Sequence, residues 1–173
     1  MTPAPTLHTD RLTLRGPKAS DADLVCTFLA DPVRSPGFGG PMSPNDGWRW
    51  FASMIGHWCI HGYGFWTVEA DGVPVGIVGL WNPKGWPEPE LGWVLFEGAE
   101  GKGYATEAAI AVRDYAYGTL GWTTLTSNIV PSNEKSKAVA RKLGASFERL
   151  YDNPSMGPDE LWRHPGPTSG ANL

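Results

Sequence analysis

Residues 96–108 join the end of an expected strand, a turn of small residues and the start of an expected helix. Glycine recurs at Gly101 and Gly103, and an apolar stripe at helical spacing begins at Ala105. A helix N-terminus has unpaired backbone N–H groups and about half a positive charge, so it can bind a phosphate without side-chain cations. The chain must therefore place a strand, an anion-binding turn and a helix in succession, which favours an α/β domain.

A second explanation of these glycines is a tight strand-to-helix turn that binds no ligand. The Walker motif is excluded because no Gly-Lys-Ser/Thr closes a longer glycine loop, and the dinucleotide fingerprint is excluded because its third glycine is absent. If a ligand binds, a side chain at Gly103 would stand between it and the amides. Lys102 and the Thr106 hydroxyl would add contacts to a pyrophosphate.

The rest of the pattern predicts seven strands and four helices. The strands are expected at residues 11–15, 65–70, 73–80, 90–96, 123–130, 147–151 and 160–162. The helices are expected at residues 20–31, 45–61, 105–118 and 133–143. Asp71-Gly72 predicts a hairpin between two of the strands. The order predicts one α/β (α+β) domain over residues 1–173, with a mixed six- to seven-stranded sheet, helices on both faces, and flexible tails at 1–8 and 164–173.

Charge and hydropathy exclude several classes of function. The net charge of -4 lacks the basic footprint of a nucleic-acid binder and suits an amine substrate. No apolar run reaches the roughly 20 residues that span a bilayer, so no membrane role is expected. Thr2, Pro3 and Ala4 follow Met1 without the basic and apolar regions of a secretory signal, which predicts a cytoplasmic protein.

The segment Glu100-Gly101-Lys102-Gly103-Tyr104-Ala105 resembles the coenzyme A motif of the GNAT superfamily of N-acetyltransferases, an Arg or Gln followed by x-x-Gly-x-Gly/Ala. Glu100 departs from that motif and adds negative charge near the expected pyrophosphate. Residues 101–108, the opening 9–15 and the segment 129–144 are similar to the RimJ/RimL-like branch, which contains ribosomal-protein N-terminal acetyltransferases. The resemblance implies acetyl-CoA as co-substrate and a twisted sheet that splays between its fourth and fifth strands to admit the pantetheine arm.

The resemblance also implies catalytic residues. Glu90, at the start of the strand leading into the turn, matches an acidic position of the branch and is the expected general base, directly or through water. An exposed strand-edge charge is the alternative, and Glu88 could replace Glu90 in this role. Asn133 is expected to contact the pantetheine or to act only as a helix cap, and Ser136 to protonate the departing thiolate. The tyrosine that serves as acid in many members is replaced here by Ala140.

A wider set of residues is expected to hold the co-substrate. It comprises Phe96, Gly101, Lys102, Gly103, Tyr104, Ala105, Thr106, Asn133, Ser136 and Arg141. Arg141 belongs to a basic helix face that is also explained as a solvated surface. No metal is expected, because His57 and His61 share a helical face without an acidic or cysteine partner.

Trp81 and Trp86 flank the loop 82–85 and, with Glu88, are the expected substrate-binding residues. Packing in a homodimer explains the two tryptophans equally well. The predicted reaction is acetyl transfer from acetyl-CoA to a primary amine, either a protein N-terminus or a small molecule. Direct transfer in a ternary complex is expected because neither cofactor element contains a cysteine. The alternatives are an acyl-CoA-binding sensor with little catalysis, motivated by Glu100 and the missing tyrosine, and a protein that acts through its tryptophan-rich surface.

Overall fold

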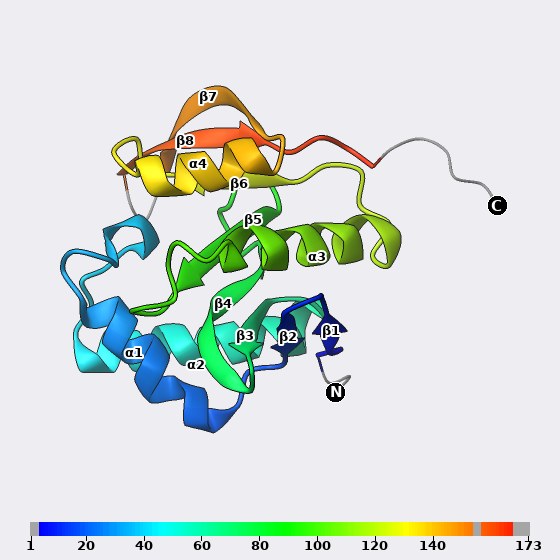
Figure 1. The fold of residues 1–173 in the computed structure, drawn as a ribbon. Coiled ribbons are helices and arrows are strands. Elements are labelled where there is room, and N and C mark those ends of the chain that lie inside the picture. The colour runs from blue at the N-terminus through cyan, green and yellow to red at the C-terminus, as the bar shows by residue number, and fades with distance from the viewer. Residues whose placement is uncertain (1–3, 154–156, 168–173) are drawn as a thin grey trace.

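Eight strands form one mixed sheet in the order β1-β2-β3-β4-β5-β6-β8-β7 (Figure 1). The computed structural model describes residues 4–153 and 157–167. The strands are β1 (Leu7–His8), β2 (Leu12–Arg15), β3 (Phe65–Ala70), β4 (Val73–Trp81), β5 (Glu90–Leu95), β6 (Thr126–Ile129), β7 (Ser146–Asn153) and β8 (Gly157–Arg163). Only β5 and β6 are parallel neighbours; the other neighbouring pairs in this described sheet are antiparallel. The seven predicted strands are present, and β1 is an addition to them.

Four α-helices cover the two faces of the sheet (Figure 1). They are α1 (Ala22–Ala30), α2 (Pro44–His61), α3 (Tyr104–Gly118) and α4 (Glu134–Lys142), with short 3-10 turns η1 (Ala19–Asp21) and η2 (Pro36–Phe38). None of these helices is long and apolar enough to cross a bilayer. The single mixed α/β domain with helices on both faces is therefore confirmed.

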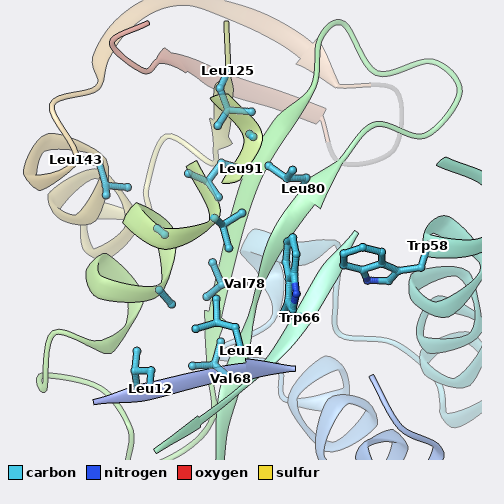
Figure 2. Packing of buried hydrophobic residues seen from close by; sticks show 14 of the residues in the cluster. Leu12, Leu14, Trp58, Trp66, Val68, Val78, Leu80, Leu91, Leu125 and Leu143 are labelled. Carbon is cyan, nitrogen blue, oxygen red and sulfur yellow. The ribbon is translucent and has the colours of Figure 1, made fainter. Parts of the chain in front are cut away.

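Alternate residues of the central strands face two separate cores, as the two-residue period of a strand requires. On one face Trp66 and Val78 pack against Ala108 and Val112 of α3; Figure 2 shows the strand side chains of this core in a row. On the other face Ile77 packs with residues of α1 and α2: Val25, Phe28, Leu29, Phe51 and Met54. The sheet is thus fixed on both faces.

The splay predicted for the sheet lies between β5 and β6, which are the fourth and fifth predicted strands. The two strands share one residue pair, Glu90 with Thr126. Beside it, Ser127 Oγ donates a hydrogen bond of 2.6 Å to the carbonyl of Leu91. β6 ends at Ile129 and is shorter than the predicted 123–130. The sheet is therefore joined at the start of β5 and separates toward the end of β5, where the glycine-rich turn begins.

A buried ion pair joins the start of the chain to the sheet. Arg15 makes a two-pronged contact with Asp21, at 2.7 and 2.8 Å, and Thr67 also donates to Asp21 at 2.8 Å. The Asp21 carboxylate accepts from the backbone N–H of Lys18 as well, at 2.8 Å. The first helix consequently begins at Ala22, after this aspartate, and not at the predicted Ser20.

Parts of both expected tails are packed against the fold. Leu7 and His8 pair with β2, and Trp66 Nε1 donates a 2.7 Å hydrogen bond to the carbonyl of Pro5. His164 is buried and its Nε2 lies 2.9 Å from Ser127 Oγ. These parts of the two expected tails therefore have backbone and ring partners in the sheet, and the flexibility of the tails stays a prediction. Tail residues 1–3 and 168–173 lie outside the described residues.

Candidate active site

The glycine-rich turn leaves a helix N-terminus open. Helix α3 begins at Tyr104 directly after Gly103, and its first backbone bond runs from the Glu107 N–H to the Gly103 carbonyl at 3.1 Å. The amides of Gly103 and the next three residues precede that bond, so they have no helical partner. No side chain among the described residues caps this end. Four N–H donors are therefore available at the positive end of the helix dipole.

The two glycines of the turn keep the space beside these amides clear. Gly101 and Gly103 have φ values of 78° and 82°, in the left-handed region that favours glycine. A Cβ at Gly101 would meet nothing within 4 Å, and one at Gly103 would meet only Arg11 Nη2, at 3.4 Å. A side chain at either position would extend into otherwise open space at the turn. The turn thus fits a pyrophosphate group, with Lys102 exposed beside it and Thr106 half-buried in the first helical turn.

The negative charge of Glu100 is compensated. Its carboxylate forms an ion pair with Arg34, whose guanidinium also donates a 2.9 Å hydrogen bond to the carbonyl of Leu95. Arg34 comes from the segment between α1 and α2 and could not be linked to Glu100 from the sequence pattern. The negative charge that Glu100 adds near the expected pyrophosphate is therefore balanced by Arg34.

A second ion pair holds the first turn of α3 against the entry to β2. Arg11 Nε donates to Glu107 at 2.7 Å, and its Nη1 donates to the carbonyl of Lys102 at 3.0 Å. Thr9 Oγ1 donates to the other oxygen of Glu107 at 2.6 Å. Burial alone would raise the pKa of Glu107, but these hydrogen bonds and the positive charge of Arg11 lower it. Arg11 thus brings a cation to the edge of the turn, a contribution that the sequence reasoning missed.

Glu90 is the first residue of β5 and lies where the sheet begins to splay. Its carboxylate accepts from Trp86 Nε1 at 2.5 Å, from Asn128 Nδ2 at 3.1 Å and from the Asn128 backbone N–H at 3.3 Å. Burial of the carboxyl group raises its pKa to about 7, against the lowering effect of these bonds, and the nearby charge of Asp159 adds to the rise. A carboxyl group with such a pKa exchanges protons readily at neutral pH, as a general base must.

The Glu90 carboxyl group faces a small cavity of about 60 Å³. Its walls are mostly aromatic, and its polar residues are amides and carboxylates. The lining residues are Gly37, Phe38, Trp50, Phe65, Trp81, Trp86, Glu90, Asn128, Asn153 and Asp159. Trp50 stacks on Trp81 with ring centroids 5.9 Å apart. Both predicted tryptophans, Trp81 and Trp86, therefore line the same cavity as the predicted base.

Glu88 is directed elsewhere. Its carboxylate makes a two-pronged ion pair with Arg163, at 2.5 and 2.8 Å, and this contact lowers its pKa. Residues 86–89 are irregular in the structure, so the two-residue period that would place Glu88 beside Glu90 does not hold there. Glu88 is not among the residues that line the cavity.

Asn133 and Ser136 occupy the first turn of α4. Asn133 Oδ1 accepts from the Ser136 backbone N–H at 3.0 Å, so Asn133 is the N-cap of the helix. A Cβ built on Gly37 would lie 2.9 Å from Asn133 Nδ2, which places this cap against a residue of the cavity wall. Arg141 lies in the last turn of α4, and its guanidinium carbon is 5.4 Å from the centroid of the Trp162 ring. The structure therefore brings Asn133 to the cavity rim, whereas the side chain of Arg141 packs on Trp162 of β8.

His57 supports the cavity from behind. Its Nδ1 lies 2.8 Å from the carbonyl of Tyr63, and its Nε2 accepts from the Asn82 backbone N–H at 3.1 Å. The ring stacks on Trp81, with centroids 4.5 Å apart. Burial lowers its pKa, which favours the neutral ring that these two contacts require. Among the described residues no group of three or more histidines, cysteines or carboxylates is arranged for a metal.

A wider and shallower groove of about 610 Å³ runs along β1 and α3. Asp10, Glu107 and Asp114 are its acidic lining residues, and Glu107 is held by Arg11 and Thr9. The hydrogen bonds from Arg11 and Thr9 lower the pKa of Glu107, whereas burial raises that of Glu90, so the smaller cavity at Glu90 is the stronger candidate for chemistry.

Comparison with known proteins gives consistent matches. A family model described as an acetyltransferase (GNAT) domain matches residues 11–146. The chain is 28% identical over 153 residues to an uncharacterized N-acetyltransferase, p20, of Bacillus licheniformis, covering 84% of each protein. It is 27% identical over 179 residues to the FsC-acetyl coenzyme A-N(2)-transacetylase of Aspergillus fumigatus, covering 90% of this chain and 73% of that protein.

A solved structure agrees with these matches. The crystal structure of an acetyltransferase from Agrobacterium tumefaciens str. C58 is 38% identical to this chain and superimposes with a TM-score of 0.87. The match covers 95% of this chain and 96% of that one. The likeness thus extends over nearly the whole of both chains.

Proposed function

Because the chain belongs to the GNAT acetyltransferase family and is an acyltransferase enzyme, we propose that it transfers an acetyl group from acetyl-CoA directly to a primary amine, with Glu90 as the general base. One observation carries this proposal. A carboxyl group with a pKa of about 7 lies at the point where β5 and β6 separate, and it faces an aromatic cavity. An amine that enters this cavity would find a proton acceptor next to the crevice expected to hold the thioester.

The residues of the glycine-rich turn would hold the co-substrate. The open amides from Gly103 to Thr106 would bind its pyrophosphate, with Lys102 and Arg11 supplying positive charge at the edge. Phe96, which precedes the turn, donates its backbone N–H to Val75 and keeps the end of β5 fixed at the mouth of the splay. Acetyl-CoA supplies the activated thioester to which the acceptor nitrogen adds.

Glu90 would deprotonate the acceptor, directly or through a water molecule. An amine near pH 7 is mostly an ammonium ion, and only the neutral form has the lone pair that attacks the thioester. Trp86 and Asn128 hold the Glu90 carboxylate by hydrogen bonds, so its oxygens stay in place while the proton moves. A pKa near 7 lets the group accept that proton and later release it to solvent.

Ser136 is the proposed donor of the proton that the departing thiolate takes up. Asn133 caps the helix turn on which Ser136 lies and so would orient it. Neither segment 96–108 nor segment 129–144 contains a cysteine. Direct attack by the amine therefore accounts for the transfer without an acyl-enzyme.

We also propose the branch of the family and the cellular location. The run Gly101 to Ala108 and the opening 9–15 support the RimJ/RimL-like branch, and a cytoplasmic location belongs to the same proposal. The acceptor is accordingly a protein N-terminus or a small-molecule amine. The alternative of an acyl-CoA-binding sensor was based on Glu100 and on the missing tyrosine. The first of these grounds is weakened because Arg34 neutralises the charge of Glu100.

Two assays test the proposal together. A ligand at 100 times its Kd stabilises a protein by about 2.7 kcal/mol, so saturating CoA should raise the melting temperature clearly. Thiol release from acetyl-CoA with a panel of primary amines should then exceed the background hydrolysis. A thermal shift without thiol release for any amine would favour the sensor, and no shift would reject the acetyl-CoA site itself.

A further inference from the structure

Among the described residues that line the cavity, two buried side-chain oxygen atoms lack a hydrogen-bond partner. They are Oδ1 of Asn128 and Oδ1 of Asp159. Both residues line the cavity, and Asp159 is 1% exposed. The Asn128 amide is oriented by its Nδ2 bond to the Glu90 carboxylate, so its oxygen points away from Glu90. Buried acceptors without donors are unusual in folded proteins, which points to a ligand that supplies the missing N–H groups.

The charges of the cavity suit a cation. Glu90 and Asp159 are both acidic, and no Lys, Arg or His occurs among the lining residues that the structure describes. The side-chain donors of Asn128 and Asn153 are directed at these same carboxylates, at 3.1 and 2.7 Å. Burial raises the pKa of Asp159, a cost that a bound ammonium ion would offset. A carboxylate on the ligand would instead face two like charges without a counter-ion.

The walls suit an apolar body. Phe38 packs on Trp50 and Phe65, with ring centroids 5.6 and 5.8 Å apart, and Trp50 continues onto Trp81. Aromatic faces attract cations and bury hydrocarbon, so they favour an ammonium group on a short apolar stem. The volume of about 60 Å³ holds the ammonium group and the first carbons of its stem, and the rest of a larger amine would extend through the open side of the cavity.

We propose that the acceptor is a small apolar primary amine with no carboxylate next to its amino group, bound as an ammonium ion by Glu90, Asp159 and Asn128 Oδ1. This inference rests on the proposed function and narrows it to one substrate class. In the reaction the ammonium ion gives a proton to Glu90, and its nitrogen forms a bond to the acetyl carbon. The C–S bond breaks, the thiolate takes a proton, and the second amine proton leaves to solvent. The products are the N-acetylamine and CoA.

The test uses three compounds that share one side chain: phenethylamine, phenylalaninamide and phenylalanine. Thiol release should give phenethylamine the highest kcat/KM and phenylalanine a value lower by about 100-fold, because only phenylalanine carries the repelled carboxylate. Phenylalaninamide separates the effect of size from that of charge and should fall between them. Equal or better turnover of phenylalanine, or turnover confined to peptide N-termini, would overturn the inference.

Binding keeps this test independent of catalysis. With CoA present, phenethylamine should raise the melting temperature further and phenylalanine should not. If that pattern holds while no amine releases thiol, the proposed function fails and the inference on ligand class stands. If both assays treat the two compounds alike, the inference itself is wrong.

Substitution of Asp159 tests whether this residue causes the preference for phenethylamine over phenylalanine. Asp159→Asn should raise KM for phenethylamine by about tenfold, with a smaller change in kcat, and should narrow the gap to phenylalanine. Asp152→Asn is the matched control, since Asp152 is an exposed aspartate of the same hairpin. An unchanged KM in folded Asp159→Asn would remove Asp159 from the site. If that variant does not fold, the comparison of the three compounds on the unaltered protein still decides the proposal.

Discussion

Trp86 donates its indole N–H to the carboxylate of Glu90, with Nε1 and Oε2 2.5 Å apart. The two residues are only four positions apart, on either side of the irregular segment 87–89. Trp86 therefore both forms part of the cavity wall and orients the carboxyl group of Glu90. A change in the wall at Trp86 must also change the environment of Glu90.

Glu90→Gln should reduce kcat by about 100- to 10,000-fold, the usual contribution of a general base. In the unaltered enzyme, kcat/KM should rise with pH and level off above about 7, because only the ionised carboxylate accepts a proton. The variant should lose this rise. The pH profile of thiol release measures both effects, and a retained ionisation near pH 7 in the variant would assign it to another group.

The same substitution should increase stability in alkaline solution. The folded protein holds the Glu90 proton more tightly than the unfolded chain does, so the ionisation of Glu90 lowers the free energy of unfolding as pH rises from 4.5 to about 7. At about 1.4 kcal/mol per pH unit, the cost that Gln removes is at most about 3 kcal/mol.

Urea unfolding should therefore show Glu90→Gln as more stable than the unaltered protein at pH 8.5, with no gain at pH 4. The control is Glu69→Gln, since Glu69 forms an ion pair with Arg15 at 2.7 Å on the same sheet. Loss of this ion pair in Glu69→Gln should lower the free energy of unfolding at neutral pH. An equal gain for Glu90→Gln at both pH values would mean that ionisation is not the cause.

Gly103→Glu should abolish the thermal shift produced by CoA, because the side chain would fill the space before the amides and add negative charge. A matched control lies at the other end of α3: Gly121 also has a positive φ, 70°, and a Cβ added there would meet nothing within 4 Å. Gly121→Glu should cost roughly 1–2 kcal/mol of backbone strain and keep the CoA response. Loss of the response in both variants would indicate strain and not the binding site.

Arg34→Gln should weaken CoA binding, because it leaves Glu100 uncompensated beside the turn. The pair is partly exposed, so the expected loss of affinity is modest, about two- to fivefold. The double variant Arg34→Gln with Glu100→Gln should recover most of it. Isothermal titration at low and high salt measures the effect; a double variant as weak as the single one would show that Arg34 acts through its bond to Leu95 instead.

Asp21→Asn should destabilise the fold by about 3 kcal/mol, since it leaves the partly buried Arg15 with Glu69 as its remaining carboxylate partner. Burial alone would raise the pKa of Asp21, but the hydrogen bonds from Arg15, Lys18 and Thr67 lower it. This contribution is present above the ordinary aspartate pKa and is lost as pH falls through the lowered value. Urea unfolding across acidic pH should show a smaller decline for the variant, whereas thiol release per folded molecule at pH 7 should be unchanged.

Features set by neighbouring residues were predicted well. The hairpin at Asp71-Gly72 has both residues at positive φ, and α4 ends before Gly144, whose φ is 77°. The open helix start at Gly103 follows equally from its own sequence. Such turns and caps depend on backbone preferences over a few residues, so one sequence is enough to read them.

Features formed by residues that are distant in the sequence were not predicted. Asn128 and Asp159 reach the cavity from β6 and β8, and nothing near them in sequence indicates Glu90 as a neighbour. Arg34 is 66 positions from Glu100. Pairings across the sheet are decided by topology, which a single sequence does not determine at the level of side chains.

The sheet is almost divided between β5 and β6, and this has a consequence for motion within the molecule. In the described residues the paired backbone of the two parts meets at Glu90 and Thr126. A rigid rotation of the three-stranded part against the five-stranded part has its axis near that bridge, and displacement grows with distance from the axis. The far end of the crevice can widen by such a rotation while Glu90, at the fulcrum, keeps its position.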